Sequence, residues 1–178
     1  RSIRNLRGNC SFLMIKNYIQ LLRVPQWIKN LFVFVPLMFS LHLFEADYFI
    51  STLKAFIIFC LASSFIYIIN DIIDVEADAA HPQKKYRPLP SGKISKQSAW
   101  MTSIVIFLLL IILSFISPIE FIYFLASFIL LNIVYSIYFK HIVILDVFSI
   151  ATGFTIRVLG GAAIISVPVS SWLVLTTM

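Results

Sequence analysis

The sequence predicts an all-α, polytopic transmembrane helix bundle, and three observations support this prediction. Of the 178 residues, 60% are hydrophobic and only 12% are charged, whereas soluble domains average about 45–50% and about 25%. Apolar runs close to the ~20 residues that cross a hydrocarbon core recur along the whole chain. The charged residues gather between these runs. One soluble core cannot explain this pattern, but lipid-facing helices can, because they satisfy their backbone hydrogen bonds internally.

Five complete spans and the beginning of a sixth are expected. The spans cover about residues 28–44, 48–69, 98–116, 119–139 and 142–167, and the sixth starts near residue 170. Pro36 lies within the first span as a tolerated kink. Residues 1–27 form a basic interfacial leader, and its stretch 12–23 fits an amphipathic helix in the membrane interface. Trp27 suits the headgroup region at the membrane boundary.

The positive charges fall on one side of this topology. Twelve of the 14 Lys and Arg residues lie in residues 1–29, in the segment after the second span or after the fourth span, all on the same face of an alternating arrangement. The positive-inside rule makes that face cytoplasmic. We therefore expect an integral protein of the cell membrane. Its net charge of +6 favours the lipid bilayer and a phosphate-bearing substrate as partners, and not nucleic acid.

The end of the second span carries an acidic segment. At ~100° per residue, Asp71, Asp74 and Asp78 fall within a ~60° arc of one helix face. Three carboxylates on one face repel each other, so near a membrane they need protonation, cationic partners or a metal ion. Hard oxygen ligands suit Mg²⁺. We interpret the three aspartates as metal ligands with a catalytic role. The competing interpretation is an acidic helix end that pairs with the basic loop after it.

Residues 70–96 are interpreted as a cytoplasmic catalytic loop. Lys84, Lys85 and Arg87 follow the aspartates closely. Arg87 suits bidentate binding of a phosphate, and the lysines suit phosphate as point charges. The competing interpretation is an ordinary basic loop on the cytoplasmic side.

Further candidates for substrate binding come from other parts of the chain. Lys29 lies at the same interface and either binds a phosphate or anchors the span by snorkelling. Asn70 flanks the aspartates, and Tyr135 and Lys140 end the fourth span. Arg157 lies too deep in the fifth span for easy snorkelling, so it is expected to face a polar cavity or a partner.

The pattern Asn70-Asp71-x-x-Asp74-x-x-x-Asp78 resembles the first aspartate-rich motif of the UbiA superfamily of intramembrane prenyltransferases. Scattered residues are most similar to its decaprenyl-phosphate phosphoribosyltransferase branch. They are Arg23–Asn30, Phe34–Leu37, His81–Pro82, Arg87–Pro88, Ser91–Gly92, Tyr135–Ser136, Lys140, Asp146–Phe148, Gly153–Phe154, Arg157 and Gly160–Gly161. The resemblance extends from about residue 21 to the end of the sequence. One departure is that Ala79 follows the last aspartate, where family members often have arginine.

The resemblance implies a bundle of nine transmembrane helices around a central cavity that opens to lipid. Two polar motifs on cytoplasmic loops would face each other and hold a diphosphate through Mg²⁺. Only the first motif falls within these 178 residues. We therefore expect residues 1–178 to be a single transmembrane domain that is incomplete at its C-terminus and inactive alone.

In the phosphoribosyl branch, the implied reaction transfers 5-phosphoribose from phosphoribosyl diphosphate to a polyprenyl phosphate, a step in cell wall biosynthesis. One alternative is a prenyltransferase that moves an isoprenoid chain from its diphosphate to an aromatic acceptor. An alternative of another class is a cation-coupled transporter. That class places polar groups near the membrane midplane, whereas most polar residues here gather at the cytoplasmic ends of the spans.

Overall fold

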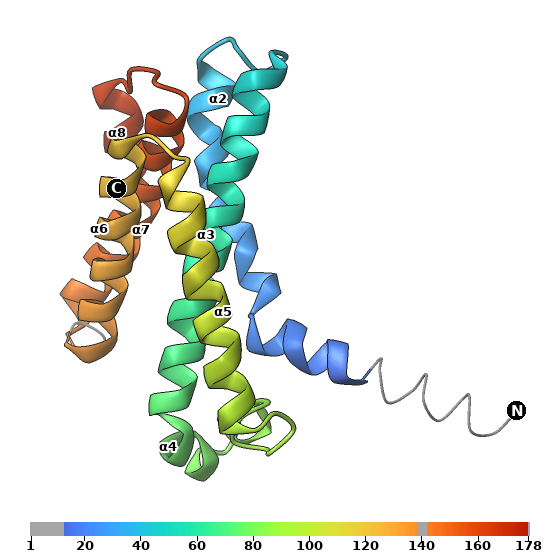
Figure 1. The fold of residues 1–178 in the computed structure, drawn as a ribbon. Coiled ribbons are helices and arrows are strands. Elements are labelled where there is room, and N and C mark those ends of the chain that lie inside the picture. Colours follow the sequence, from blue (N-terminus) through green and yellow to red (C-terminus); the bar gives the residue numbers. More distant parts are fainter. Residues whose placement is uncertain (1–12, 139–141, 178) are drawn as a thin grey trace, which may run out of the picture.

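The computed structural model describes residues 13–138 and 142–177, and these form the all-α bundle that the sequence predicts (Figure 1). Within this part of the chain, four helices are long and apolar enough to cross a membrane. They are α3 (Ala46–Ile73), α5 (Lys96–Phe115), α6 (Ile119–Ile137) and α7 (Val143–Ile164). The shorter elements are η1 (Val24–Phe34), α2 (Val35–Phe39), α4 (Val75–Ala80), η2 (Lys84–Tyr86) and α8 (Ser171–Thr177).

The four long helices confirm the second to fifth predicted spans, and α8 lies where the sixth was expected. Helix α4 and the loop after it lie at one end of the bundle, while the connections from α2 to α3 and from α5 to α6 lie at the other (Figure 1). The acidic segment is therefore placed at one end of the long helices and not in their middle.

The first predicted span differs from the prediction in both position and helix type. It begins at Val24 and ends at Phe39, and its first 11 residues form a 3₁₀-helix. Pro25 and Pro36 each lie in the first turn of η1 and α2, where the missing N–H costs little. At ~2.0 Å per 3₁₀ residue and ~1.5 Å per α residue, the two elements rise roughly 30 Å. Sixteen residues thus match the thickness of a hydrocarbon core.

Burial along η1 follows a period of three. Asn30, Val33 and Pro36 are buried and Trp27 is half-buried, whereas the residues between Trp27 and Val33 other than Asn30 are exposed. Side chains at i and i+3 are eclipsed in a 3₁₀-helix, so Trp27, Asn30 and Val33 form one straight row, and Pro36 follows it at the start of α2. This row faces α3 and α7, against which η1 packs.

The helix before η1, residues 13–21, leaves the bundle sideways in Figure 1. Its apolar side chains Leu13, Met14 and Ile19 are exposed, while Leu21 is fully buried. Arg23 has a left-handed backbone conformation, with φ 50° and ψ 43°, between this helix and η1. The interfacial role of the leader stays a prediction.

Ser64 of α3 connects the leader to the bundle. Its buried hydroxyl donates to the carbonyl oxygen of Leu22 at 2.8 Å and accepts from Trp27 Nε1 at 3.0 Å. We expect Ser64→Ala to lower the free energy of unfolding by about 1–3 kcal/mol, because the change leaves a donor and an acceptor unpaired. Thermal unfolding in detergent, together with hydrogen exchange over residues 13–27, measures the effect. Ser127→Ala is the matched control, since that exposed serine bonds only within its own helix; equal effects of the two changes would contradict the prediction.

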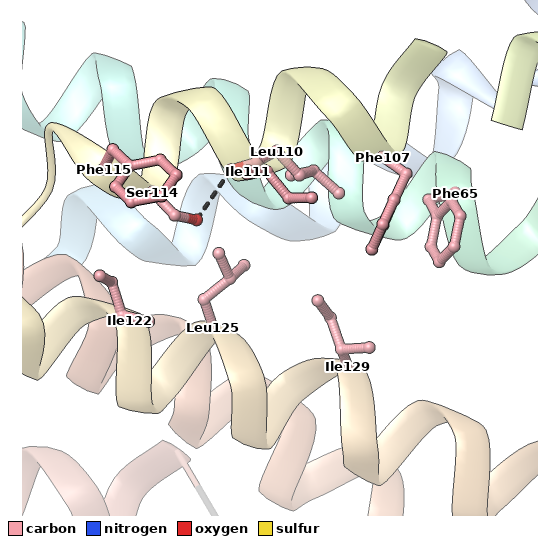
Figure 2. Close-up of a pocket in the computed structure, with 9 residues that line it drawn as sticks. All are labelled: Phe65, Phe107, Leu110, Ile111, Ser114, Phe115, Ile122, Leu125 and Ile129. Atoms are coloured by element: carbon pink, nitrogen blue, oxygen red, sulfur yellow. Dashed lines mark hydrogen bonds between the residues drawn. The ribbon is translucent and has the colours of Figure 1, made fainter. Parts of the chain in front are cut away.

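An apolar groove separates α5 from α6 (Figure 2). Helix α5 packs on α3, and α6 packs on α7, which leaves a cavity of about 320 Å³ between the two pairs. Its lining residues are Phe65, Phe107, Leu110, Ile111, Ser114, Phe115, Ile122, Leu125 and Ile129. The Ser114 hydroxyl donates to the Leu110 carbonyl oxygen of its own helix. None of the described residues that line this groove offers a charged group for a phosphate, so the polar chemistry lies elsewhere.

Candidate functional site

The acidic segment crosses a bend between two helices. Helix α3 ends at Ile73, Asp74 has φ −88° and ψ 8°, and α4 then begins at Val75. The bend keeps helical hydrogen bonding, because Asp74 N donates to Asn70 O at 2.9 Å and Asp78 N donates to Asp74 O at 2.8 Å. The predicted helix face therefore continues past the end of α3, but it is interrupted at the central aspartate.

Three cations surround Asp71 and Asp78, and we refer to Arg23, Lys84 and Arg87 as the basic clamp. Arg23 Nη2 lies 2.6 Å from Asp71 Oδ1. Arg87 Nη1 joins both carboxylates, at 3.3 Å from Asp71 Oδ1 and 2.6 Å from Asp78 Oδ2. Lys84 Nζ lies 3.4 Å from Asp78 Oδ1. The two carboxylates are only 4% and 2% exposed, so the clamp supplies the positive charge that they need in a buried position.

The clamp combines one expected and one unexpected feature. Pairing of the acidic helix end with Lys84 and Arg87 agrees with the competing interpretation of the sequence. Arg23 was not singled out as a site residue, although its position just before the first span placed it at the same end of the bundle as the acidic segment. Its guanidinium also stacks over the Tyr67 ring at 4.6 Å, which fixes it beside α3.

Asp74 and Lys85 lie outside this network. Asp74 is half-buried and makes no side-chain hydrogen bond or ion pair with a described residue. Lys85 is exposed, with Nζ 5.2 Å from the centre of the Tyr86 ring. Among the described residues, no group of three or more His, Cys, Asp or Glu side chains is arranged to hold a metal ion. The carboxylate oxygens have the chemistry that Mg²⁺ requires, and their assignment as its ligands stays a prediction.

A polar cavity of about 290 Å³ lies between η1, α3, α6 and α7. It brings together four of the predicted substrate-binding residues: Lys29, Asn70, Tyr135 and Arg157. They come from four different elements, so only the tertiary fold collects them. Its other lining residues are Ile66, Tyr67, Phe128, Leu131, Asn132, Ser149, Ile150, Gly153 and Phe154. Among the residues that the structure describes, two cations and no carboxylate line the cavity, which favours an anionic ligand. Lys140, the remaining predicted residue, lies outside the described residues.

Asn70 connects this cavity to the acidic segment. Its side chain lines the cavity and accepts a hydrogen bond from Ser136 Oγ at 3.0 Å, while the next residue, Asp71, is held by the clamp. Tyr135, also on α6, donates its hydroxyl to Asp146 Oδ1 of α7 at 2.8 Å. These two contacts fix the polar side of α6 against α3 and α7.

Arg157 of α7 also lines this cavity and is 8% exposed. Its Nε donates to Asn30 Oδ1 at 2.7 Å, and its Nη1 donates to the Gly153 carbonyl oxygen at 2.7 Å. The guanidinium also lies over the rings of Phe128 and Phe154, at 4.6 and 5.4 Å from their centres. Arg157 thus lines a cavity, which is one of the two environments expected from its depth within the fifth span.

Comparison with known proteins agrees with this arrangement. The model of the UbiA prenyltransferase family matches residues 31–178. A decaprenyl-phosphate phosphoribosyltransferase of Mycolicibacterium smegmatis is 34% identical over 91% of this chain and 52% of its own length. Another, from Corynebacterium glutamicum, is 32% identical over 88% of this chain and 48% of its own. The chain therefore spans about half the length of these relatives.

A solved structure shares the fold. The UbiA homologue of Archaeoglobus fulgidus bound to DMAPP and Mg²⁺ superposes with a TM-score of 0.70 at 21% sequence identity, over 90% of this chain and 58% of that chain. The family model covers most of the sequence. The helix arrangement also matches that of the Archaeoglobus structure, although few residues are identical. This chain therefore belongs to the UbiA prenyltransferase family.

Proposed function

We propose that the chain is the N-terminal part of a Mg²⁺-dependent transferase that moves 5-phosphoribose from phosphoribosyl diphosphate to a polyprenyl phosphate. The reaction would take place at the cytoplasmic face of the cell membrane. The observation that carries the proposal is that the acidic segment adjoins the cation-lined cavity. Asn70 of α3 lines the cavity, and the next residue, Asp71, is bound by the basic clamp. The two similar decaprenyl-phosphate phosphoribosyltransferases support this choice of donor and acceptor.

Asp71, Asp74 and Asp78 are the residues that would hold Mg²⁺, which the Archaeoglobus homologue binds together with DMAPP. The chemistry that the ion supplies when bound is neutralisation of the charge that develops on the departing diphosphate. As the carboxylates turn to the ion, Lys84 and Arg87 would exchange their carboxylate partners for diphosphate oxygens. Lys85, exposed beside them, would contact the same group.

The cavity then positions the reacting groups. The bond that breaks joins the C1 carbon of ribose to the diphosphate oxygen, and the bond that forms joins C1 to an oxygen of the acceptor phosphate. The cationic character that C1 gains is offset by the diphosphate beside it. Asn70 and Tyr135 would orient the ribose between the diphosphate and the acceptor phosphate. Both side chains line the cavity and are fixed by neighbouring polar groups.

The test uses the full-length protein in nanodiscs, with labelled phosphoribosyl diphosphate and polyprenyl phosphate. We expect label to enter the lipid phase with Mg²⁺ and not with a chelator, and not with Asp71→Ala or Asp74→Ala. No transfer by folded protein would contradict the proposal. Isoprenoid diphosphates with an aromatic acceptor would be tried next, because the same aspartates serve that reaction, and a cation-flux assay would follow for the transporter alternative.

A further inference from the structure

Arg157 is a buried cation without an acidic partner among the described residues. An ionised side chain at this depth is normally paired, because desolvation without a counter-charge is costly. Its contacts are a carbonyl oxygen, an amide oxygen and two aromatic rings. An arginine has five N–H donors, and Nη2 makes no hydrogen bond with a described residue. The side chain is therefore held in place by neutral groups while part of its donor capacity remains unused beside the cavity.

The neighbouring residues fix this guanidinium in one position. Asn30, which is 1% exposed, accepts from Nε and donates through Nδ2 to Cys60 Sγ at 3.3 Å and to Ser63 Oγ at 3.4 Å. The chain of contacts ties Arg157 to α3 through η1. A rigidly held cation that lines a cavity is arranged for binding a ligand, since little conformational entropy is left to lose.

The position of Arg157 differs from that of the clamp. Ser63, in the Arg157 network, and Asp71, in the clamp, are eight residues apart on α3, which is about 12 Å along the helix axis. One diphosphate cannot occupy both positions. A ribose ring with a phosphate group on each side is of suitable size to extend from one to the other, as is a diphosphate beside a separate phosphate monoester.

We infer that Arg157 and Lys29 form a second anion site in this cavity, which binds a phosphate monoester. Where that monoester is the 5-phosphate of the donor, the site also excludes donors that carry a diphosphate at one end and only hydrocarbon at the other. The inference rests on the proposed function and adds to it two residues that bind a second phosphate group. The phosphate monoester comes either from the 5-phosphate of the donor or from the acceptor lipid. Both are dianions that accept from a guanidinium, whereas an isoprenoid tail would leave the Arg157 charge buried against hydrocarbon.

The experiment measures binding and not turnover. Full-length protein in nanodiscs is titrated with ribose 5-phosphate, farnesyl phosphate and, with Mg²⁺ present, inorganic diphosphate, and ligand-induced thermal shifts give the apparent Kd. We expect Arg157→Gln to weaken one phosphate monoester about 10- to 100-fold, the range for a charge-assisted hydrogen bond. The apparent Kd for diphosphate should change by less than about 2-fold, which is smaller than the change expected from losing any charge-assisted hydrogen bond. Loss for ribose 5-phosphate assigns the site to the donor, and loss for farnesyl phosphate assigns it to the acceptor.

Two further variants separate binding from structure. Lys29→Gln alters an exposed side chain and should weaken the same monoester without lowering thermal stability. Asn30→Ala removes the Nε partner of Arg157 but keeps its charge. If Asn30→Ala destabilises the fold as much as Arg157→Gln, and if Arg157→Gln and Lys29→Gln bind both monoesters like wild type, Arg157 has only a structural role and the inference is wrong.

These outcomes are separable from failure of the proposed function. Monoester binding that depends on Arg157 without any label transfer from phosphoribosyl diphosphate would keep the anion site and reject the reaction. Label transfer with unchanged monoester binding by Arg157→Gln would keep the reaction and reject the anion site.

Discussion

Under the proposed function, replacing Asp71 with asparagine is expected to lower the rate of phosphoribosyl transfer by the full-length protein about 10²- to 10³-fold, the usual effect of removing one preorganised group that stabilises transition-state charge. Asparagine keeps the shape of the side chain but loses the negative charge that the clamp arginines bind and that the proposed Mg²⁺ site requires. Initial rates at saturating donor and acceptor measure the effect. Wild-type rates from this variant would remove Asp71 from the metal site.

The same substitution should also lower stability, and this separates Asp71 from Asp74. Asp71 is buried and bonds Arg23 and Arg87, which are 26% and 32% exposed. Losing the carboxylate charge should cost about 1–2 kcal/mol of unfolding free energy in the presence of a chelator, because partial exposure screens both ion pairs.

Asp74→Asn is the matched control for this effect. Asp74 makes no ion pair with a described residue, so its change should lower the transfer rate without lowering the unfolding temperature under the same conditions. Equal stability of the two variants would mean that the clamp contributes nothing to the fold, and full activity of Asp74→Asn would exclude it as a metal ligand.

Gly161→Ala is expected to have the largest effect on folding. A Cβ atom at Gly161 would overlap the Val33 carbonyl oxygen and lie 2.9 Å from the carbonyl carbon. These are backbone atoms of η1, so no side-chain rotation relieves the contact and the two helices must separate. Overpacking of this kind costs about 1–3 kcal/mol and occasionally more, and we expect a value at the upper end. Thermal unfolding and the monodisperse fraction in one detergent measure it.

Two other glycines of α7 provide graded controls. A Cβ at Gly160 would lie 2.9 Å from the Phe59 ring, which is packed edge-on against Phe121 and Phe128 and can shift only slightly. A Cβ at Gly153 would meet Arg157 Nη1 at 3.4 Å and Leu131 Cδ2 at 3.9 Å. The loss of stability should therefore decrease from Gly161 to Gly160 to Gly153, and any other order would contradict the packing of η1 on α7.

The sequence predicted the features that depend on local composition. Four spans followed from hydropathy, because lipid contact requires long apolar runs whatever their neighbours are. Lys29, Asn70, Tyr135 and Arg157 were each identified as polar groups at unfavourable or interfacial depths. That they line one cavity was not predictable, since the cavity depends on how η1, α3, α6 and α7 pack.

The missed features depend on long-range contacts or on an uncommon helix type. Arg23 lies 48 residues from Asp71 in sequence, and nothing local indicates that pair. The bend at Asp74 was hidden because the surrounding residues keep helical spacing. The 3₁₀ geometry of η1 was missed because apolar side chains occupy eight of its 11 positions, so no clear periodicity separates three residues per turn from 3.6.

The straight row of η1 also limits how this segment can change in length. One inserted residue would rotate the following residues by about 120° in a 3₁₀-helix. Such a rotation would replace the buried Asn30 and Val33 with exposed neighbours, including the charged Lys29, and would remove the amide that holds Arg157. Three inserted residues would restore the row while adding about 6 Å of height. Insertions and deletions in this segment should therefore be tolerated only in multiples of three, and only as far as the membrane thickness allows.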